Sequence, residues 1–165
     1  MTSEIYQQLQ NIIPELNAQD VLDSNDFDDF SEWINEKNQL FHYIELKEYY
    51  DNGIEDNFYF NKLNVDTEQL QANIDAEISQ LVENFEDDGE FSFDDGTDMM
   101  EKTEEIIFDT IKNMANQHQL SLLVIHRENP YWLLVPTQNQ KILNEIVETF
   151  NQIFNIDNDL PMVVY

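Results

Sequence analysis

Cysteine is absent from this sequence of 165 residues, and glycine and arginine are scarce. Without cysteine the chain forms no disulfide, carries no thiol nucleophile and offers no thiolate to zinc or to an iron–sulfur cluster. The three glycines complete no phosphate-binding loop or dinucleotide fingerprint, and no serine stands in a nucleophile elbow. Arg127 is the single arginine, whereas an enzyme acting on phosphates or carboxylates tends to use several. We therefore expect a protein that is not an enzyme and needs no cofactor.

Long apolar runs are also missing. No stretch approaches the roughly 20 apolar residues that span a bilayer. The first residues, Met1–Glu4, show neither the basic nor the apolar region of a signal peptide. Together with the lack of cysteine, these features predict a cytoplasmic protein.

Apolar and aromatic residues are nevertheless plentiful enough for a folded core. They make up 41% and 12% of the chain, whereas disordered acidic chains are poor in aromatics. The length suits one domain of ordinary size. We expect residues 1–165 to form a single acidic domain.

The charge of the chain is strongly negative and unevenly distributed. Asp and Glu number 35 against 7 Lys and Arg, a net charge of −28, and residues 1–109 alone hold 30 acids and 4 bases. Such a chain repels the phosphates of nucleic acids and anionic membranes, so we expect neither as a partner. A basic protein surface or metal ions are the favoured partners, unless the acidity serves only solubility.

Helical spacing of apolar residues recurs along the chain. Ser3 is the expected N-cap of a first helix that ends near Pro14, and three later pairs have the spacing of a capping box: Asp66 with Gln69, Asp98 with Glu101, and Thr137 with Gln140. The apolar stripes predict helices over Ile5–Ile13, about Asp26–Asn38, Leu70–Phe85, Ile107–Met114 and Ile142–Phe154.

Other segments favour strands. Leu120–Ile125 and Tyr131–Val135, joined by a turn at Arg127–Pro130, predict a β-hairpin. Further strands are expected in Leu40–Leu46, Asn57–Phe60, Phe91–Phe93 and Met162–Tyr165, with a turn at Asp51–Gly53. The predicted fold is α+β, with helices packed on one face of a small, mostly antiparallel sheet.

Two acidic clusters are the candidate partner-binding residues. The first belongs to the run from Asp20 to Glu36, which contains no base, and the second lies between two predicted helices. The aromatic residues of the first run, Phe27, Phe30 and Trp33, have helical spacing and are more typical of a core than of an interface. The predicted contact residues are Asp23, Asp26, Asp28, Asp29, Glu32, Asp87, Asp88, Glu90, Asp94 and Asp95.

The second cluster also has a register with features of a calcium loop. Aligned on Gly89, twelve residues from Asn84 to Asp95 resemble an EF-hand, although Asn84 stands where Asp is usual and Asp95 where a bidentate Glu is usual. The simpler interpretation is an acidic segment that joins two helices. His42, His118 and His126 are far apart in sequence and form no zinc-binding pair, so we expect each to be a structural histidine and no metal site.

Two resemblances bear on function. Ile44-Glu45-Leu46-Lys47, Leu122–Ile125 and Tyr131–Pro136 resemble an uncharacterised group of small acidic bacterial proteins over about residues 40–155. In that group an early strand ends in an acid-aromatic-lysine pattern, with Leu46 here at the aromatic position, and a late strand ends in Val-Pro before the last helix. The resemblance implies no activity and no site residue. In size and acidity the chain also resembles bacterial immunity proteins, which neutralise a toxin by covering it.

The favoured hypothesis is an immunity-type inhibitor that covers a basic protein, possibly a toxin, with its acidic surface. The alternatives are a DNA mimic that occupies a DNA-binding protein, an acidic adaptor of unknown role, and a calcium-responsive module.

Overall fold

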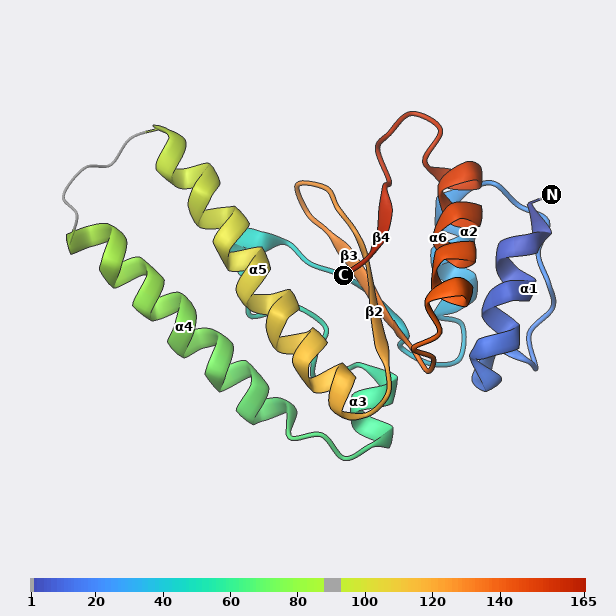
Figure 1. The fold of residues 1–165 in the computed structure, drawn as a ribbon, viewed down its shortest axis with the longest axis horizontal. Helices are drawn as coiled ribbons and strands as arrows, with labels where there is room; N and C mark the ends of the chain where they lie inside the picture. The colour runs from blue at the N-terminus through green and yellow to red at the C-terminus, as the bar shows by residue number, and fades with distance from the viewer. Residues whose placement is uncertain (1, 88–92) are drawn as a thin grey trace.

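The computed structural model describes residues 2–87 and 93–165, with side chains described outside 85–98. Six α-helices, two short 3₁₀ helices and four strands follow one another along this described part of the chain (Figure 1). In order, they are α1 Ser3–Ile12, η1 Pro14–Leu16, α2 Phe27–Ile34, β1 Phe41–Tyr43, η2 Leu46–Glu48, α3 Phe58–Lys62, α4 Thr67–Asp87, α5 Phe93–Gln117, β2 Ser121–Ile125, β3 Tyr131–Val135, α6 Gln140–Phe154 and β4 Met162–Val164.

The four strands form one antiparallel sheet in the order β1-β3-β2-β4. β2 and β3 are the predicted hairpin and lie in its centre, where Leu123 pairs with Leu133. β1 and β4 occupy the edges. The α+β architecture and the antiparallel sheet that the sequence predicts are therefore confirmed.

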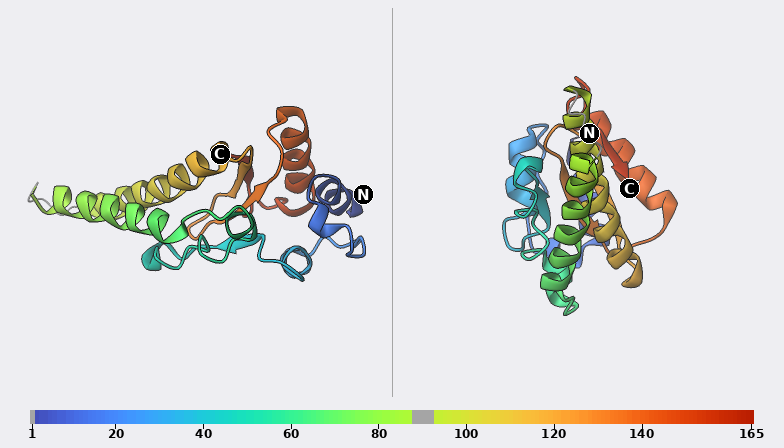
Figure 2. Two further views of the ribbon diagram at one scale, coloured as in Figure 1. Left: turned by 90° about the horizontal axis from the view of Figure 1, so that it is seen from below. Right: turned by 90° about the vertical axis from the view of Figure 1, so that its left-hand side faces the viewer.

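Helices cover both faces of this sheet, whereas the sequence predicts helices on one face only. The strands run between the α4–α5 pair on one side and α1, α2 and α6 on the other (Figures 1 and 2). Every residue of β2 is buried, although successive side chains of a strand point to opposite faces. The uninterrupted apolar runs of β2 and β3 are the pattern expected of strands covered on both faces.

The face toward α2 and α6 is aromatic. Phe30 is fully buried, and its ring centroid lies 5.7 Å from that of Phe41 and 5.5 Å from that of Phe150. Phe27 and Phe154 extend the same cluster. Aromatic rings at these separations contribute about 0.5–1.5 kcal/mol per pair beyond the burial of their apolar surface.

The opposite face holds a buried polar group of side chains. His42 of β1 lies against Trp132 of β3, with ring centroids 4.6 Å apart, and its Nε2 is 3.0 Å from Nδ2 of Asn57. Trp132 donates its indole N–H to the carbonyl oxygen of Asn52 at 2.8 Å. Each of these buried polar groups has a hydrogen-bond partner, as burial requires.

The longest helices, α4 and α5, pack side by side and extend away from the sheet (Figures 1 and 2). Leu70, Ile74 and Ile78 of α4 are buried, as the apolar stripe predicts. The predicted cap at Asp66 is formed, because its Oδ1 accepts the Gln69 N–H at 3.0 Å. The side chain of Gln69 binds Asn73 instead of closing the capping box.

Several local expectations were wrong. Asn57–Phe60 is not a strand, because the Asn57 side chain accepts the Phe60 N–H and caps the helix α3. α2 ends at Ile34 rather than near Asn38. α5 already begins at Phe93, so Asp98 lies inside the helix rather than at its N-terminus, and Phe93 does not belong to the expected strand. The rest of that strand, residues 91–92, lies outside the described residues.

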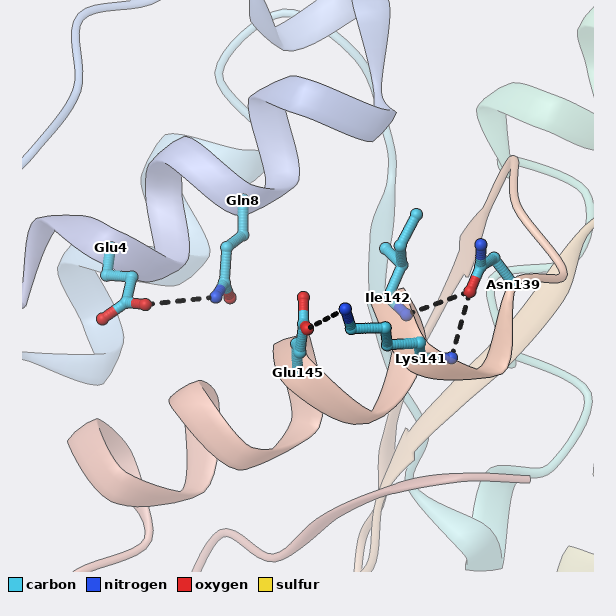
Figure 3. A network of polar contacts seen from close by, with 6 residues as sticks. All are labelled: Glu4, Gln8, Asn139, Lys141, Ile142 and Glu145. Atoms are coloured by element: carbon cyan, nitrogen blue, oxygen red, sulfur yellow. Dashed lines mark hydrogen bonds and ion pairs between the residues drawn. The ribbon is translucent and has the colours of Figure 1, made fainter.

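The predicted caps of α1 and α6 are each displaced along the chain. α1 follows Thr2 and already includes Ser3, and α6 is capped by Asn139 rather than by Thr137. Figure 3 shows the Asn139 side chain accepting the N–H groups of Lys141 and Ile142, beside the α1 residues Glu4 and Gln8. Gln8 also donates to Thr149 at 3.0 Å, which ties α1 to α6.

Both edge strands are covered by asparagine side chains. Asn35 accepts the N–H of Phe41 on β1 at 2.9 Å and donates to its carbonyl oxygen at 2.8 Å. Asn151 makes the same pair of bonds with Met162 on β4, at 2.8 and 3.0 Å. Each amide takes the place of a neighbouring strand at that residue, which limits pairing with another chain.

Candidate functional site

The acidic face of α2 is the better described of the two predicted contact regions. Asp26 caps the helix, because its Oδ1 accepts the N–H of Asp28 at 2.8 Å and that of Asp29 at 3.4 Å. Asp28 and Asp29 stand in the first turn, where negative charge interacts favourably with the helix dipole. The acids therefore help to build the helix that presents them.

The aromatic residues between these acids point inward, as their spacing predicts. Phe30 and Trp33 are buried, and Phe27 packs partly buried against the same core. Trp33 meets Tyr6 of α1 edge to face, with centroids 4.9 Å apart. These three aromatics are thus unavailable as anchors for a partner, and the outer surface of α2 is left to the carboxylates.

The carboxylates of the run are all exposed, and several converge on Tyr6. Burial, followed by the charges of Asp29, Asp26 and Asp23, raises the pKa of Tyr6 to about 12. Ser24 donates to Asp29 at 2.6 Å, and Thr2 donates to Asp23. The exposed acids of this surface, which we call the α2 acidic face, are Asp20, Asp23, Asp26, Asp28, Asp29, Glu32 and Glu36.

An open hollow of about 240 Å³ lies on this face. Asp29, Glu32 and Glu36 line it together with Leu22 and Trp33. Carboxylates around a partly apolar floor suit the end of a Lys or Arg side chain, whose stem is apolar and whose head is charged. The sequence does not predict that Leu22 and the outer edge of Trp33 line this hollow. Its shape depends on how the segment 20–26 packs against α2, which local spacing does not indicate.

The ion pairs within the described residues lie elsewhere. Lys62 binds Glu15 at 2.8 Å, Lys141 lies 3.9 Å from Glu145, and His126 lies 3.1 Å from Glu104. None of these three side chains, Lys62, Lys141 and His126, comes from the α2 acidic face or pairs with one of its carboxylates. Its charge is consequently left for solvent or for a partner.

The second predicted cluster is largely outside the described residues. Asp88 and Glu90 fall in the segment that the structure does not describe, and nothing is described of the side chains of Asp87, Asp94 and Asp95. The proposed twelve-residue calcium loop includes residues 88–92, which lie outside the described residues, so it stays a prediction. Of its other residues, 84–87 belong to the end of α4 and 93–95 to the start of α5.

The histidines occupy separate surroundings, as expected for structural residues. His42 is buried, which lowers its pKa to about 4, against the opposing effect of a hydrogen bond with the Gln39 backbone. Across the residues with described side chains, no three His, Asp or Glu side chains come together as metal ligands. None of the described helices has the length and apolar character needed to cross a bilayer.

Comparisons with known proteins add no relative to this description. No protein-family model matches the chain, no curated protein matches its sequence, and no solved structure matches its fold. The resemblances noted from the sequence remain hypotheses.

Proposed function

We propose that this protein binds a positively charged protein through the α2 acidic face, as an immunity-type inhibitor covers a basic toxin. The observation that supports the proposal most directly is the separation of side chains on α2. Its aromatics enter the core, while the seven carboxylates of α2 and of the segments that flank it remain exposed. Such a surface attracts a cationic protein over long range and speeds its association.

The hollow beside Glu32 is where this long-range attraction would lead to specific contacts with a cationic side chain of the partner. Three carboxylates around it provide acceptors for ammonium or guanidinium donors, and charge-assisted hydrogen bonds are stronger than neutral ones. The proposed role needs no reacting group and no cofactor, and it suits a protein that meets its partner in the cytoplasm.

Charge reversal at four positions tests the proposal. Asp20, Asp28, Glu32 and Glu36 are suitable because their side chains take no part in the capping bonds that Asp26 accepts. With all four changed to Lys, we expect association with a cationic protein captured from the host to slow by about tenfold or more at low salt. Stopped-flow fluorescence measures the rate, and circular dichroism checks that the helices are retained.

A matched variant separates position from total charge. Changing Glu55, Glu77, Glu148 and Asp157 to Lys alters the net charge equally but lies outside the α2 acidic face, at exposed positions. This control should retain most of the association rate. Equal rates for the two variants would contradict the α2 acidic face as the contact. A captured partner whose DNA binding competes with this protein would instead favour the DNA-mimic alternative.

A further inference from the structure

A groove of about 460 Å³ opens between α4, α5 and η2. The helices α4 and α5 lie on the side of the molecule away from α2 (Figure 1). Leu46 of η2, Ile78 and Val82 of α4, and Met99 and Met100 of α5 give it an apolar lining. Tyr49, Lys47, Ser79 and Thr103 complete its walls. Apolar side chains that line an open groove rather than a closed core suggest an interaction site.

A second groove between the same two helices provides an internal comparison. It measures about 430 Å³ and is lined mainly by polar side chains, among them Asn73, Thr110, Asn113 and Gln117. The packing of α4 against α5 therefore does not by itself require that apolar residues line the grooves between them. The apolar lining is confined to the groove beside η2.

Exposed carboxylates lie next in sequence to several residues that line the apolar groove. Glu45 and Glu48 flank Leu46, Glu83 follows Val82, and Glu101 follows Met100, all at exposed positions. An adjoining hollow shares Leu46 and Met100 and is lined by Glu101, Glu104 and Glu128, with Arg127. Lys47 adds a positive charge to the groove wall, and across the two hollows together the three lining carboxylates outnumber the two lining cations, Lys47 and Arg127.

We propose that this groove binds a basic amphipathic helix of the partner. An apolar helix face would lie on Leu46, Val82 and Met100, while its Lys and Arg side chains would reach the neighbouring carboxylates. Methionine suits the task because its flexible, polarisable side chain adapts to different apolar surfaces. A second copy of this chain is a poor occupant, since each copy carries a net charge of −28. The inference rests on the proposed function only in taking the partner to be cationic.

Methionine methyl groups allow a direct test in the intact protein. Besides Met1 the chain has four methionines: Met99 and Met100 line the apolar groove, Met114 lines the polar groove and Met162 is buried in β4. With ¹³C-methyl methionine, titration with a Leu/Lys peptide of about 18 residues, roughly five helical turns, should shift the signals of Met99 and Met100. Those of Met114 and Met162 should stay in place.

Two variants on α5 provide the matched comparison. Met100→Gln and Met114→Gln each replace a half-buried methionine by a polar side chain of similar length, one in each groove. Fluorescence anisotropy should show about tenfold weaker peptide binding for Met100→Gln and little change for Met114→Gln. A scrambled peptide of the same composition, which cannot form an apolar face, should also bind about tenfold more weakly.

Three results would overturn the inference: equal binding of the two peptides, equal shifts of all the methionine signals, or equal losses in the two variants. The variant with four reversed charges on α2 separates this proposal from the previous one. It should keep its affinity for the peptide while losing its partner. If that variant alone lost its affinity for the peptide, the peptide would bind at the α2 acidic face, and the groove would be rejected as its binding site.

Discussion

β1 contributes Phe41 to one face of the sheet and His42 to the other, and the two side chains enter different surroundings. Phe41 joins a cluster of rings whose stability comes from close packing. His42 joins a set of hydrogen bonds in which each donor needs its acceptor. The packing of Phe41 thus depends on the volume of its ring, whereas the hydrogen bonds of His42 depend on its protonation state.

The hydrogen bonds also fix which nitrogen of His42 carries the proton. Asn57 accepts the Phe60 N–H with its Oδ1, so its Nδ2 is the group that faces His42 and donates to it. Nε2 of His42 therefore accepts and is unprotonated. Adding a proton there would set two donors against each other in a buried site.

Removing a ring from the aromatic face should have the largest effect. Phe30→Ala leaves a cavity among Phe27, Phe41 and Phe150, and we expect the free energy of unfolding to fall by about 3–5 kcal/mol. Urea denaturation measures the change. Tyr50→Ala is the control, because Tyr50 is 63% exposed and its loss should matter by less than about 0.5 kcal/mol. Similar losses in the two variants would mean that this face is not a packed core.

A methyl group added beside His42 should be the next most damaging change. Gly53 has φ +85°, and a Cβ there would lie 2.5 Å from Cγ of His42. Gly53→Ala should therefore lower the free energy of unfolding by about 2–4 kcal/mol, through backbone strain and overlap together. Combining it with His42→Ala should cost less than the sum of the single changes, since the overlap with the ring disappears and only that with Cβ of residue 42, at 2.7 Å, is left. Additive losses would show that the ring and the turn are not coupled.

Acid should affect the two faces of the sheet differently. Burial lowers the pKa of His42 from 6.5 to about 4, so the unfolded chain takes up a proton at higher pH than the folded one. The stability that neutral His42 contributes is complete above pH 6.5 and is lost as pH falls toward 4, by about 3 kcal/mol in all.

The variant His42→Gln isolates this contribution. All carboxylates of the variant titrate as in the natural chain, whereas the side chain at position 42 no longer titrates. The difference in the free energy of unfolding between the two proteins should shrink steadily from pH 7 to pH 4. For Phe30→Ala the corresponding difference should stay nearly constant over that range. A constant difference for His42→Gln would show that the histidine is not held neutral.

The comparison also explains where sequence interpretation succeeded. The stripe of Leu70, Ile74 and Ile78 and the two apolar runs of the hairpin are periodic, so nearby residues alone indicate them. α3 was missed because five residues are too few to show a helical period, and its aromatics are typical of strands. The acidic run was recognised, but the hollow beside Glu32 was not.

By itself the sequence determined the charge, the inward direction of the aromatics on α2 and the existence of the long helices and the hairpin. These follow from composition and from spacing along the chain. Only the tertiary structure decided that helices cover both faces, that His42 is buried beside Asn57, and that Leu46, Val82 and Met100 meet in one groove. Each of those results joins residues from different elements, and local periodicity carries no information about such distant pairs.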